Sequence, residues 1–378
     1  TILPDSSEIV REYVAHNKED LPIKISVNGQ VLGEQAFDGL DRMTVSITGG
    51  RKSVYSFAPG QRQPKSVTRP SGNQTGYAYK PELGDEPAQR IAVESTATYE
   101  YDSQNARLLR TVELNTTLER SYFSSGELKS EHISHAGEEP YVMGYEYSLN
   151  ARLLSYTDVL GQTQTYEYDD FTRLKSTRLG LLCSTFGYDA HGQLTRIETV
   201  DEAGGNTQRL CIDLEYDEFG RERKRTFDLG AGIVQTLEQT YDEVDRLIQR
   251  TLSNGSEELR DEYYNYDSRS RLCEYKCSGS QVPVDPYGKS IQCQVFGFDA
   301  VDNITFVETT FEGGRNESCY EYGNIFDPCQ LTALTNSFQP DYPARLEFHY
   351  DADGNLIRDE AGRTLTYDSL GRLSSISV

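Results

Sequence analysis

The sequence predicts an all-β protein built as one long, curved antiparallel sheet of β-hairpins. Two observations predict this fold class. A phrase of seven residues, in which an aromatic residue, a short turn and an aliphatic residue follow one another, occurs eleven times in the 378 residues. Tyr is abundant, with 26 copies, while long stretches with helical spacing of apolar residues are missing. A unit that returns every 20 to 30 residues cannot bury its own face and stacks on its neighbours.

The clearest copies of the phrase run from Tyr367 to Leu373 and from Tyr350 to Leu356. Nine of the eleven copies carry Asp directly after the aromatic residue, and seven carry Arg five places after it. Ten carry an aliphatic residue six places after it, and Glu222 is the exception. The other copies begin at Phe37, Tyr122, Tyr147, Tyr168, Tyr188, Tyr216, Tyr241, Tyr266 and Phe298.

Residues of this kind at this spacing fit a hairpin closed by a type I turn with one extra residue in the left-handed conformation. Asp suits the first turn position because its carboxylate accepts a backbone N–H two residues on. The left-handed position holds Gly in five copies and Asp in three, and both residue types tolerate a positive φ. Ala151, Thr172 and Ser270 fill it less comfortably, so we expect those turns to differ in detail.

Side chains alternate along a strand, so Asp368 is predicted to lie opposite Arg372 on one face of its hairpin and Tyr367 opposite Leu373 on the other. Each such pair contributes about 0.2 to 1 kcal/mol, and repetition makes the sum important. With Gly371 at the left-handed position, the same structural roles are predicted for Tyr350, Asp351, Gly354, Tyr241, Asp242, Arg246, Leu247, Tyr266, Asp267, Arg271, Tyr168, Asp169 and Arg173.

We predict one continuous array over residues 1–378, because no break in composition divides the chain. Residues 1–35 lead into the array, residues 58–98 are divergent Pro-rich repeats, and residues 99–378 are clear repeats. Residues 279–290 and 336–344 read as loops inserted between hairpins. Several unrelated small β domains are the alternative, but they would not explain a shared phrase.

The formal charge of −23 argues against nucleic acid or an anionic membrane surface as a partner, since both select for clusters of Lys and Arg. No apolar run approaches the roughly 18 residues of a transmembrane helix. No signal peptide opens the chain, which begins at Thr1 in mid-sequence. We therefore expect no membrane span and a fragment whose targeting signals lie outside this stretch.

No catalytic, cofactor-binding or metal-binding residue is predicted, and the chain is not expected to be an enzyme. Paired carboxylates are the machinery of glycosidases, but here most patterned Asp residues are already used in turns and opposite Arg. Asp351 opens a segment like a calcium loop, yet Gly362 stands where the loop requires Glu. Cys273 and Cys277 lie four residues apart on an extended strand, too far apart for a disulfide.

Five segments carry a family resemblance: YEYDDFTRL, FGYDAHGQL, LEYDEFGRE, FHYDADGNL and LTYDSLGRL. They resemble the YD repeats of the RHS family, above all those of bacterial polymorphic toxins and of the B and C components of Tc insecticidal toxin complexes; the related teneurins of animals share this architecture. The resemblance covers about residues 36–50 and 99–378. It implies a sheet that spirals into a hollow shell around a toxin or effector segment, of which this stretch is an open part of the wall.

The resemblance also implies partners and a location. The partners are the remainder of the same chain, or a shell-forming partner protein, and its encapsulated toxin segment; the location is outside the cell, as part of a secreted bacterial toxin. The core segment with its DPxGR signature and any toxin domain are missing from this stretch, so no catalytic residue is carried over. The alternatives are a cell-surface module that binds glycans or a receptor through loops 58–90 or 279–290, and an enzyme hidden among the carboxylates.

Overall fold

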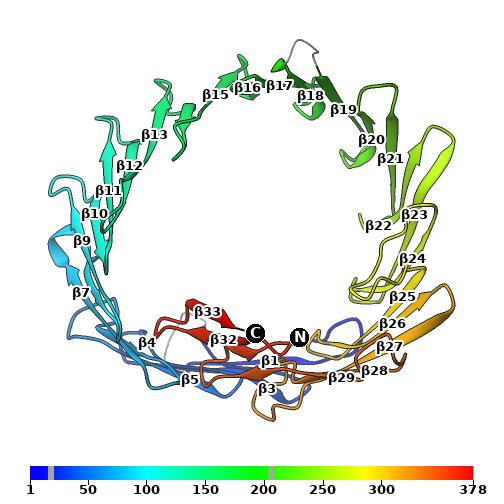
Figure 1. The fold of residues 1–378 in the computed structure, drawn as a ribbon. Coiled ribbons are helices and arrows are strands. Elements are labelled where there is room, and N and C mark those ends of the chain that lie inside the picture. Colours follow the sequence, from blue (N-terminus) through cyan, green and yellow to red (C-terminus); the bar gives the residue numbers. More distant parts are fainter. Residues whose placement is uncertain (16–20, 204–207, 378) are drawn as a thin grey trace. The chain divides into compact units, whose positions relative to one another are not determined.

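The structure, a computed structural model, describes residues 1–15, 21–203 and 208–377. Within these ranges every regular element is a β-strand, apart from one turn of 3-10 helix, η1 (Pro81–Leu83). Strands β1–β29 form one sheet of 29 strands, and β30–β33 form a second sheet of four (Figure 1). The prediction of an all-β fold with one long antiparallel sheet of hairpins is confirmed.

The strands follow one another along the chain with short connections. The first nine are β1 (Ile9–Tyr13), β2 (Pro22–Val27), β3 (Gln30–Phe37), β4 (Met43–Thr48), β5 (Arg51–Ser56), β6 (Ser66–Thr68), β7 (Gln74–Lys80), β8 (Glu86–Ile91) and β9 (Thr96–Tyr101). The next thirteen are β10 (Leu108–Glu113), β11 (Thr116–Tyr122), β12 (Leu128–His135), β13 (Tyr141–Tyr147), β14 (Leu153–Thr157), β15 (Thr163–Tyr168), β16 (Leu174–Leu179), β17 (Leu182–Tyr188), β18 (Leu194–Asp201), β19 (Gln208–Tyr216), β20 (Glu222–Asp228), β21 (Val234–Tyr241) and β22 (Leu247–Asn254). The last eleven are β23 (Glu257–Tyr266), β24 (Leu272–Ser278), β25 (Cys293–Phe298), β26 (Ile304–Phe311), β27 (Gly314–Glu321), β28 (Ala333–Asn336), β29 (Arg345–Glu347), β30 (His349–Tyr350), β31 (Leu356–Arg358), β32 (Thr364–Tyr367) and β33 (Leu373–Ser377).

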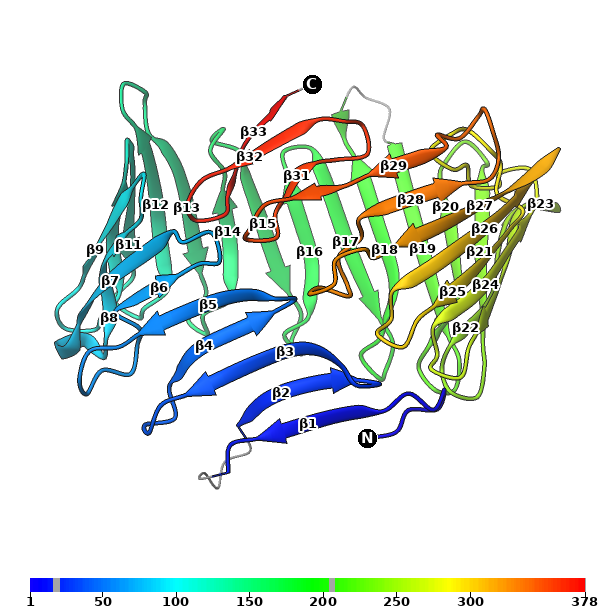
Figure 2. The same ribbon diagram turned by 90° about the horizontal axis from the view of Figure 1, so that it is seen from below.

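The chain divides into two compact units. Unit 1 comprises residues 1–98, 265–276 and 283–378, and unit 2 comprises residues 99–264 and 277–282. In unit 2, strands β10 to β22 lie side by side in chain order as a curved, twisted sheet (Figure 1). In unit 1, the last strands of the chain lie beside the first ones, so residues that are distant in sequence become neighbours (Figure 2).

Neighbouring strands pair antiparallel, and the pairing shifts by one residue at the aromatic residue of ten of the eleven phrases. Thr366 pairs with Ser375 but Tyr367 pairs with Leu373, which leaves Ser374 as the extra residue of a β-bulge. The same shift occurs at Phe37, Tyr122, Tyr147, Tyr168, Tyr188, Tyr216, Tyr241, Phe298 and Tyr350. The phrase therefore encodes a turn together with its bulge.

Fully buried apolar side chains are few and dispersed along the chain, as the spread from Val27 and Ala97 through Leu214 to Phe311 shows. Most strand residues are half-buried on one of the two faces of a sheet. The array is therefore held together mainly by cross-strand pairs and by contacts between neighbouring hairpins, and less by a single central core. Among the residues that the structure describes, no helix has the length and hydropathy to cross a membrane.

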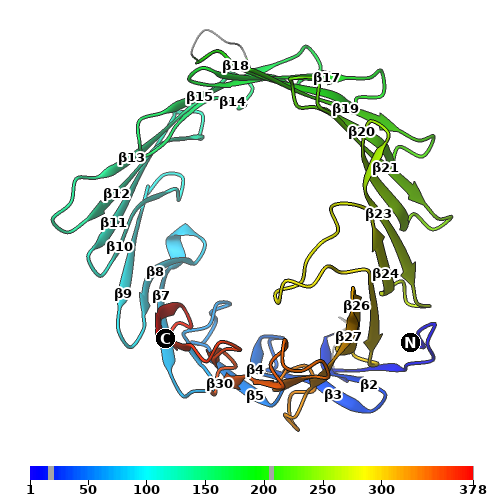
Figure 3. The ribbon, with the colours of Figure 1, turned by 45° about the vertical axis from the view of Figure 1, so that its right-hand side comes forward.

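Both predicted inserted loops connect strands: residues 279–290 lie between β24 and β25, and residues 336–344 run from the last residue of β28 to β29. Figure 3 labels β24, which the first loop follows. The second part of the first loop is not irregular, because Val284 and Ser290 form a β-bridge around a tight turn. The ring of Tyr287 in this turn lies 4.6 Å from that of Tyr342 in the other loop. The loops thus pack on each other within unit 1.

Candidate functional site: the turn and the junction between repeats

The backbone of the phrase closes in the same way in all eleven copies. In the last copy, the N–H of Asp368 donates to the carbonyl of Arg372 at 3.0 Å, and the N–H of Gly371 donates to the carbonyl of Asp368 at 2.9 Å. The fifth residue of every copy has a positive φ, including Ala151 (58°), Thr172 (76°) and Ser270 (62°). The difference that we expected at these three turns is therefore not seen in the backbone. The two closing hydrogen bonds offset the cost of a left-handed non-glycine residue.

The turn carboxylate accepts several hydrogen bonds from its own turn. Oδ1 of Asp169 accepts the backbone N–H groups of Phe171 and Arg173, each at 2.9 Å, and its Oδ2 accepts Nε of Arg173 at 2.8 Å. Where Arg is replaced by Asn, the amide takes its place, as in the bond of 2.9 Å from Asn355 to Asp351. A carboxylate held this way uses about three of its four acceptor positions within its own turn.

The hydrogen bonds that the turn Asp accepts also determine its ionisation state. Hydrogen bonds from the side chain and backbone of Arg42 lower the pKa of Asp38, although burial acts in the opposite direction. For Asp217, Asp242 and Asp267, burial is the largest single influence and would raise the pKa, but the combined bonds from the turn and its Arg outweigh it and lower the pKa. These groups are therefore held as anions.

The structure brings together the residues that the sequence singled out. The ion pair joins Asp242 to Arg246 at 2.6 Å, Asp267 to Arg271 at 2.7 Å and Asp368 to Arg372 at 2.6 Å. Across the same hairpins, the structure pairs Tyr168 with Leu174, Tyr241 with Leu247, Tyr350 with Leu356 and Tyr367 with Leu373. Tyr266 precedes a turn of the same form, and Gly354 and Gly371 occupy left-handed positions.

The sequence reasoning missed the contact that the Tyr of most phrases makes with the preceding repeat. The hydroxyl of Tyr188 donates to the backbone carbonyl of Leu174 at 2.8 Å, and Leu174 is the last residue of the previous phrase. Because the acceptor is a backbone atom, Glu222 serves as well as Leu: its carbonyl accepts the hydroxyl of Tyr241 at 3.0 Å. The equivalent bond is made by Tyr122, Tyr168, Tyr216, Tyr322, Tyr350 and Tyr367.

The Arg of the phrase reaches forward to the next repeat. Nη1 of Arg271 donates to the carbonyl of Asp299 at 2.9 Å and to Oδ1 of Asp302 at 2.8 Å, and the guanidinium lies 4.7 Å from the ring centroid of Phe298. This is a cation–π geometry, which Arg adopts more often than Lys. Similar stacking joins Arg173 to Tyr188 at 4.5 Å and Arg221 to Tyr241 at 4.8 Å. We call the combined Tyr and Arg contacts the repeat junction.

The same turn also occurs without an aromatic residue in front of it. Asp158, Asp285 and Asp359 each open a turn in which Gly follows three places later with a positive φ. The Asp–x–x–Gly spacing in the sequence predicts these turns. A pattern that requires Tyr or Phe before the Asp does not include them. Inserted loop 279–290 contains one of these turns, which explains why its second part is regular.

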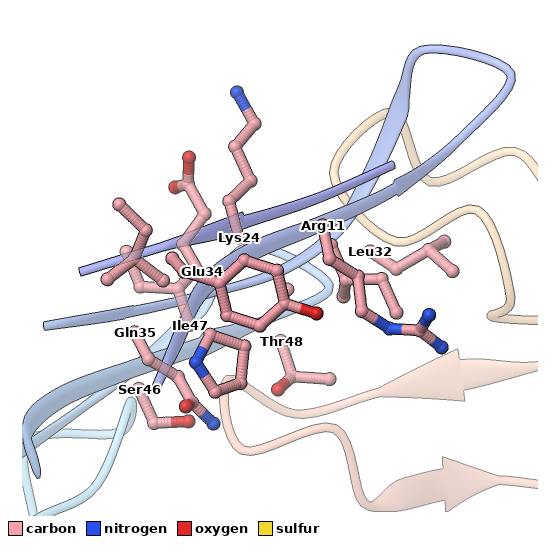
Figure 4. A pocket seen from close by; sticks show the side chains of 13 residues that line it. Arg11, Lys24, Leu32, Glu34, Gln35, Ser46, Ile47 and Thr48 are labelled. Atoms are coloured by element: carbon pink, nitrogen blue, oxygen red, sulfur yellow. The ribbon is translucent and has the colours of Figure 1, made fainter. Parts of the chain in front are cut away.

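Two pockets among the described residues bear on whether the chain holds a catalytic pair of carboxylates. A pocket of about 530 Å³ lies over strands β1–β4, and Glu34 is the single carboxylate among its lining residues (Figure 4). Its neighbours are the cations Arg11 and Lys24 and apolar strand residues. A glycosidase requires two carboxyl groups on either side of the scissile bond, which this pocket lacks.

A second pocket, of about 330 Å³, has Glu347, Asp359 and Glu360 in its lining. Asp359 accepts two turn N–H groups and Nε of Arg363, and Glu347 pairs with Arg345 at 3.1 Å. Two of the three carboxylates thus have structural partners. In residues 1–15, 21–203 and 208–377 no group of three His, Cys, Asp or Glu side chains has a metal-binding arrangement. All seven cysteines are free thiols.

Comparison with known proteins places these features in a family. The model of the family described as Teneurin YD-shell matches residues 94–288, slightly more than half of the 378 residues. A protein named tRNA3(Ser)-specific nuclease WapA, from Bacillus spizizenii, is 30% identical over 125 residues, which are 32% of this chain and 5% of that protein.

Two solved structures share the fold. The crystal structure of TcdB2–TccC3–Cdc42 matches 97% of this chain with a TM-score of 0.52 and 14% identity, and that of TcdB2–TccC3 matches 98% with a TM-score of 0.51 and 14% identity. The chain spans 26% and 27% of the length of those chains. The match to the family model covers the strands in which the turn and the repeat junction recur, and on this ground the chain belongs to the Teneurin YD-shell family.

Proposed function

We propose that this chain is a non-enzymatic wall segment of an RHS-type shell that encloses a toxin or effector segment for delivery. Membership of the YD-shell family and the fold shared with TcdB2–TccC3 support a structural shell scaffold. The observation that carries the proposal is the repeat junction. The Asp, Arg and Tyr residues that are frequent enough to suggest a reactive site are bonded to their own turn and to the neighbouring repeat.

The repeat junction also supports the proposal that residues 1–378 act as one array. Tyr188 bonds backward to Leu174 while Arg173 stacks forward on Tyr188, so neighbouring hairpins are joined by two different groups. A wall needs this kind of lateral fastening, because a single hairpin is only marginally stable in water. The proposed partners are the remainder of the same chain, or a shell-forming partner, and an enclosed toxin segment; the proposed location is outside the cell.

Binding of glycans or of a receptor through loops was the other candidate, and the loops do not favour it. Tyr287 of loop 279–290 is 39% exposed, but its ring lies 4.6 Å from that of Tyr342, which is only 3% exposed and donates its hydroxyl to Asp285. In the region 58–90, Tyr79 uses its hydroxyl to bond the carbonyl of Pro64. These rings are engaged within the protein, whereas a glycan platform presents free aromatic faces.

Protease protection of the full-length protein tests the proposal. The natural protein that contains this chain is incubated with a non-specific protease, and the digestion of its segments outside the YD repeats is followed by mass spectrometry. We expect one such segment to resist digestion in the native protein and to be cleaved rapidly after mild denaturation. Cleavage at the same rate in both states would overturn encapsulation. Binding of the 378-residue chain to a glycan array would instead support the receptor-binding alternative.

A further inference from the structure

Strand alternation places the connections of unit 1 on two opposite rims. The phrase turns lie at one end of the strands, which we call the turn rim, and the other connections lie at the opposite rim. The loops 49–50, 69–73 and 92–95 connect β4 to β5, β6 to β7 and β8 to β9, and belong to the opposite rim. The segments 267–271, 322–332, 351–355 and 368–372 belong to the turn rim.

The turn rim of the late repeats contacts the opposite rim of the early ones. Ser71 donates its backbone N–H to Oδ1 of Asp353 at 2.8 Å and its hydroxyl to Oδ2 at 2.9 Å. Nε of Arg69 lies 3.5 Å from the same carboxylate. One repeat further on, Ser369 donates its N–H and its hydroxyl to the carboxylate of Glu94.

Two further contacts extend the row. Nη1 of Arg51 pairs with Asp327 at 2.6 Å, and Nη1 of Arg269 donates to Asp5 at 3.2 Å. The four contacts keep chain order on both sides: positions 5, 51, 69–71 and 94 meet positions 269, 327, 353 and 369. Such a regular order indicates two rims in fixed register rather than isolated loop contacts. Figure 2 shows the last strands of the chain beside the first ones.

Two of the contacts include a buried residue. Ser369 is 4% exposed and Asp327 is 8% exposed. By contrast, Phe171 and Phe219 at phrase turns of unit 2 are 77% and 73% exposed, each beside the Arg of its own turn.

Glycine is required where the rims approach most closely. A Cβ atom added to Gly50, whose φ is 73°, would lie 2.5 Å from Cβ of Phe326. A Cβ added to Gly371 would lie 2.8 Å from a guanidinium nitrogen of Arg69. Gly60 has the same φ of 73° and nothing within 4 Å of the added atom, so it provides a matched comparison.

We infer that these contacts form a seam, an interaction surface through which the last repeats dock on the hairpin loops of the first 98 residues of the same chain. The seam fastens the separate four-stranded sheet β30–β33, since Asp353 and Ser369 lie in its two phrase turns. Its contacts are hydrogen bonds and ion pairs, which salt and charge reversal weaken more than they weaken apolar packing. The seam therefore opens without unfolding the hairpins on either side. This inference does not depend on the presence of a cargo.

Disulfide trapping tests the register of the seam. Ser71→Cys combined with Asp353→Cys places two thiols where the native side chains are hydrogen-bonded. Under mild oxidation we expect one intramolecular disulfide between positions 71 and 353, identified by non-reducing peptide mapping, and neither single variant gives it. If the double variant remains reduced while Ellman titration shows both new thiols accessible, the seam is not present in solution.

Hydrogen exchange tests whether the seam opens separately. For Gly50→Ala we expect amide exchange in peptides 324–330, 351–355 and 367–371 to rise several-fold, while strands β17–β22 exchange as in the wild type. Gly60→Ala is the control, because it imposes the same backbone strain without meeting the seam. Equal exchange at these peptides in both variants would refute the seam. Faster exchange throughout the chain would refute its separability.

Discussion

At the residue scale, the Arg of the phrase has more partners than sequence pairing alone suggests. Arg271 binds the carboxylate of its own turn, the backbone carbonyl and carboxylate of the next turn, and the ring of Phe298. A planar guanidinium can do this because its five N–H groups and two faces are used in different directions. Lys offers one point charge and no planar face, so we expect it to be a poor substitute.

Replacing Arg271 by Gln is therefore expected to be destabilising. The change leaves the carboxylate of Asp267 without a charged donor and that of Asp302 with Arg269 alone, and hydrogen bonds to charged groups contribute about 1.5 to 3 kcal/mol each. We expect the free energy of unfolding to fall by about 2 kcal/mol in urea titrations. Arg223→Gln is the control: Arg223 pairs with Glu215 at 2.8 Å on the exposed surface, and such pairs contribute little. An equal loss in both variants would contradict the role assigned to Arg271.

The hydroxyl of Tyr241 offers a cleaner test of the junction. Tyr241→Phe keeps the ring and removes only the bond to the carbonyl of Glu222. Loss of one such hydrogen bond is expected to lower the free energy of unfolding by about 1 kcal/mol. Tyr13→Phe, at an exposed ring in β1, is expected to leave it unchanged. The idea fails if urea midpoints of the two variants coincide.

The turn carboxylates predict sensitivity to acid. Hydrogen bonds from Arg42 hold the pKa of Asp38 below its ordinary value of 3.8 in the folded protein. A lowered folded-state pKa contributes stability that is present above the unfolded pKa and is lost as the pH falls through the folded one. We expect the stability difference between the wild type and Asp38→Asn to be constant at neutral pH and to shrink below about pH 4. A constant difference down to pH 2.5 in thermal melts would contradict this.

At the scale of the element, the hairpin depends on glycine in its strands as well as in its turns. Gly297 precedes the aromatic residue Phe298, and the ring of Phe306 on the paired strand occupies the space where a Cβ would stand. Gly144, in β13, has only Cβ of Thr157 at 3.8 Å. Both glycines lie in strands, and they differ in the side chain that packs over them.

Gly297→Ala is expected to lower the free energy of unfolding by about 1 to 3 kcal/mol, because Phe306 must leave its position. Gly144→Ala has no such clash, and alanine suits a strand at least as well as glycine, so we expect no loss. Denaturant titration of both variants checks the difference. Similar stabilities would mean that the ring of Phe306 moves at no cost.

The sequence predicted the hairpin well because its signal is local. The aromatic residue, Asp, the left-handed residue and Arg lie within seven positions, and each has one physical role in the turn. The contacts that it did not predict are non-local: the acceptor of the Tyr188 hydroxyl is a backbone atom of Leu174 and leaves no mark on the side chain at that position. The contacts of the seam are even harder to predict from the sequence, since Ser71 and Asp353 are 282 positions apart.

At the scale of the whole molecule, the array is stabilised between neighbours. Neighbouring hairpins are joined by a Tyr hydroxyl, by an Arg or by both, where the phrase carries these residues, so stability accumulates along the chain, as in other repeat proteins. Within unit 1 the seam adds contacts between the two ends of the chain. The function of such a scaffold depends on residues in all its repeats, whereas the activity of an enzyme depends on a few residues.

The most direct test of the central claim compares stability with protection across one panel of variants. Arg271→Gln, Tyr241→Phe, Gly297→Ala and Gly50→Ala, with their matched controls, are introduced into the full-length protein. Urea midpoints and the protease resistance of the enclosed segment are then measured for each. If the phrase is structural, protection falls in step with stability in every variant, and the controls keep both. A variant that loses protection or delivery while its urea midpoint equals that of the wild type would contradict a purely structural role and point to a binding or catalytic residue.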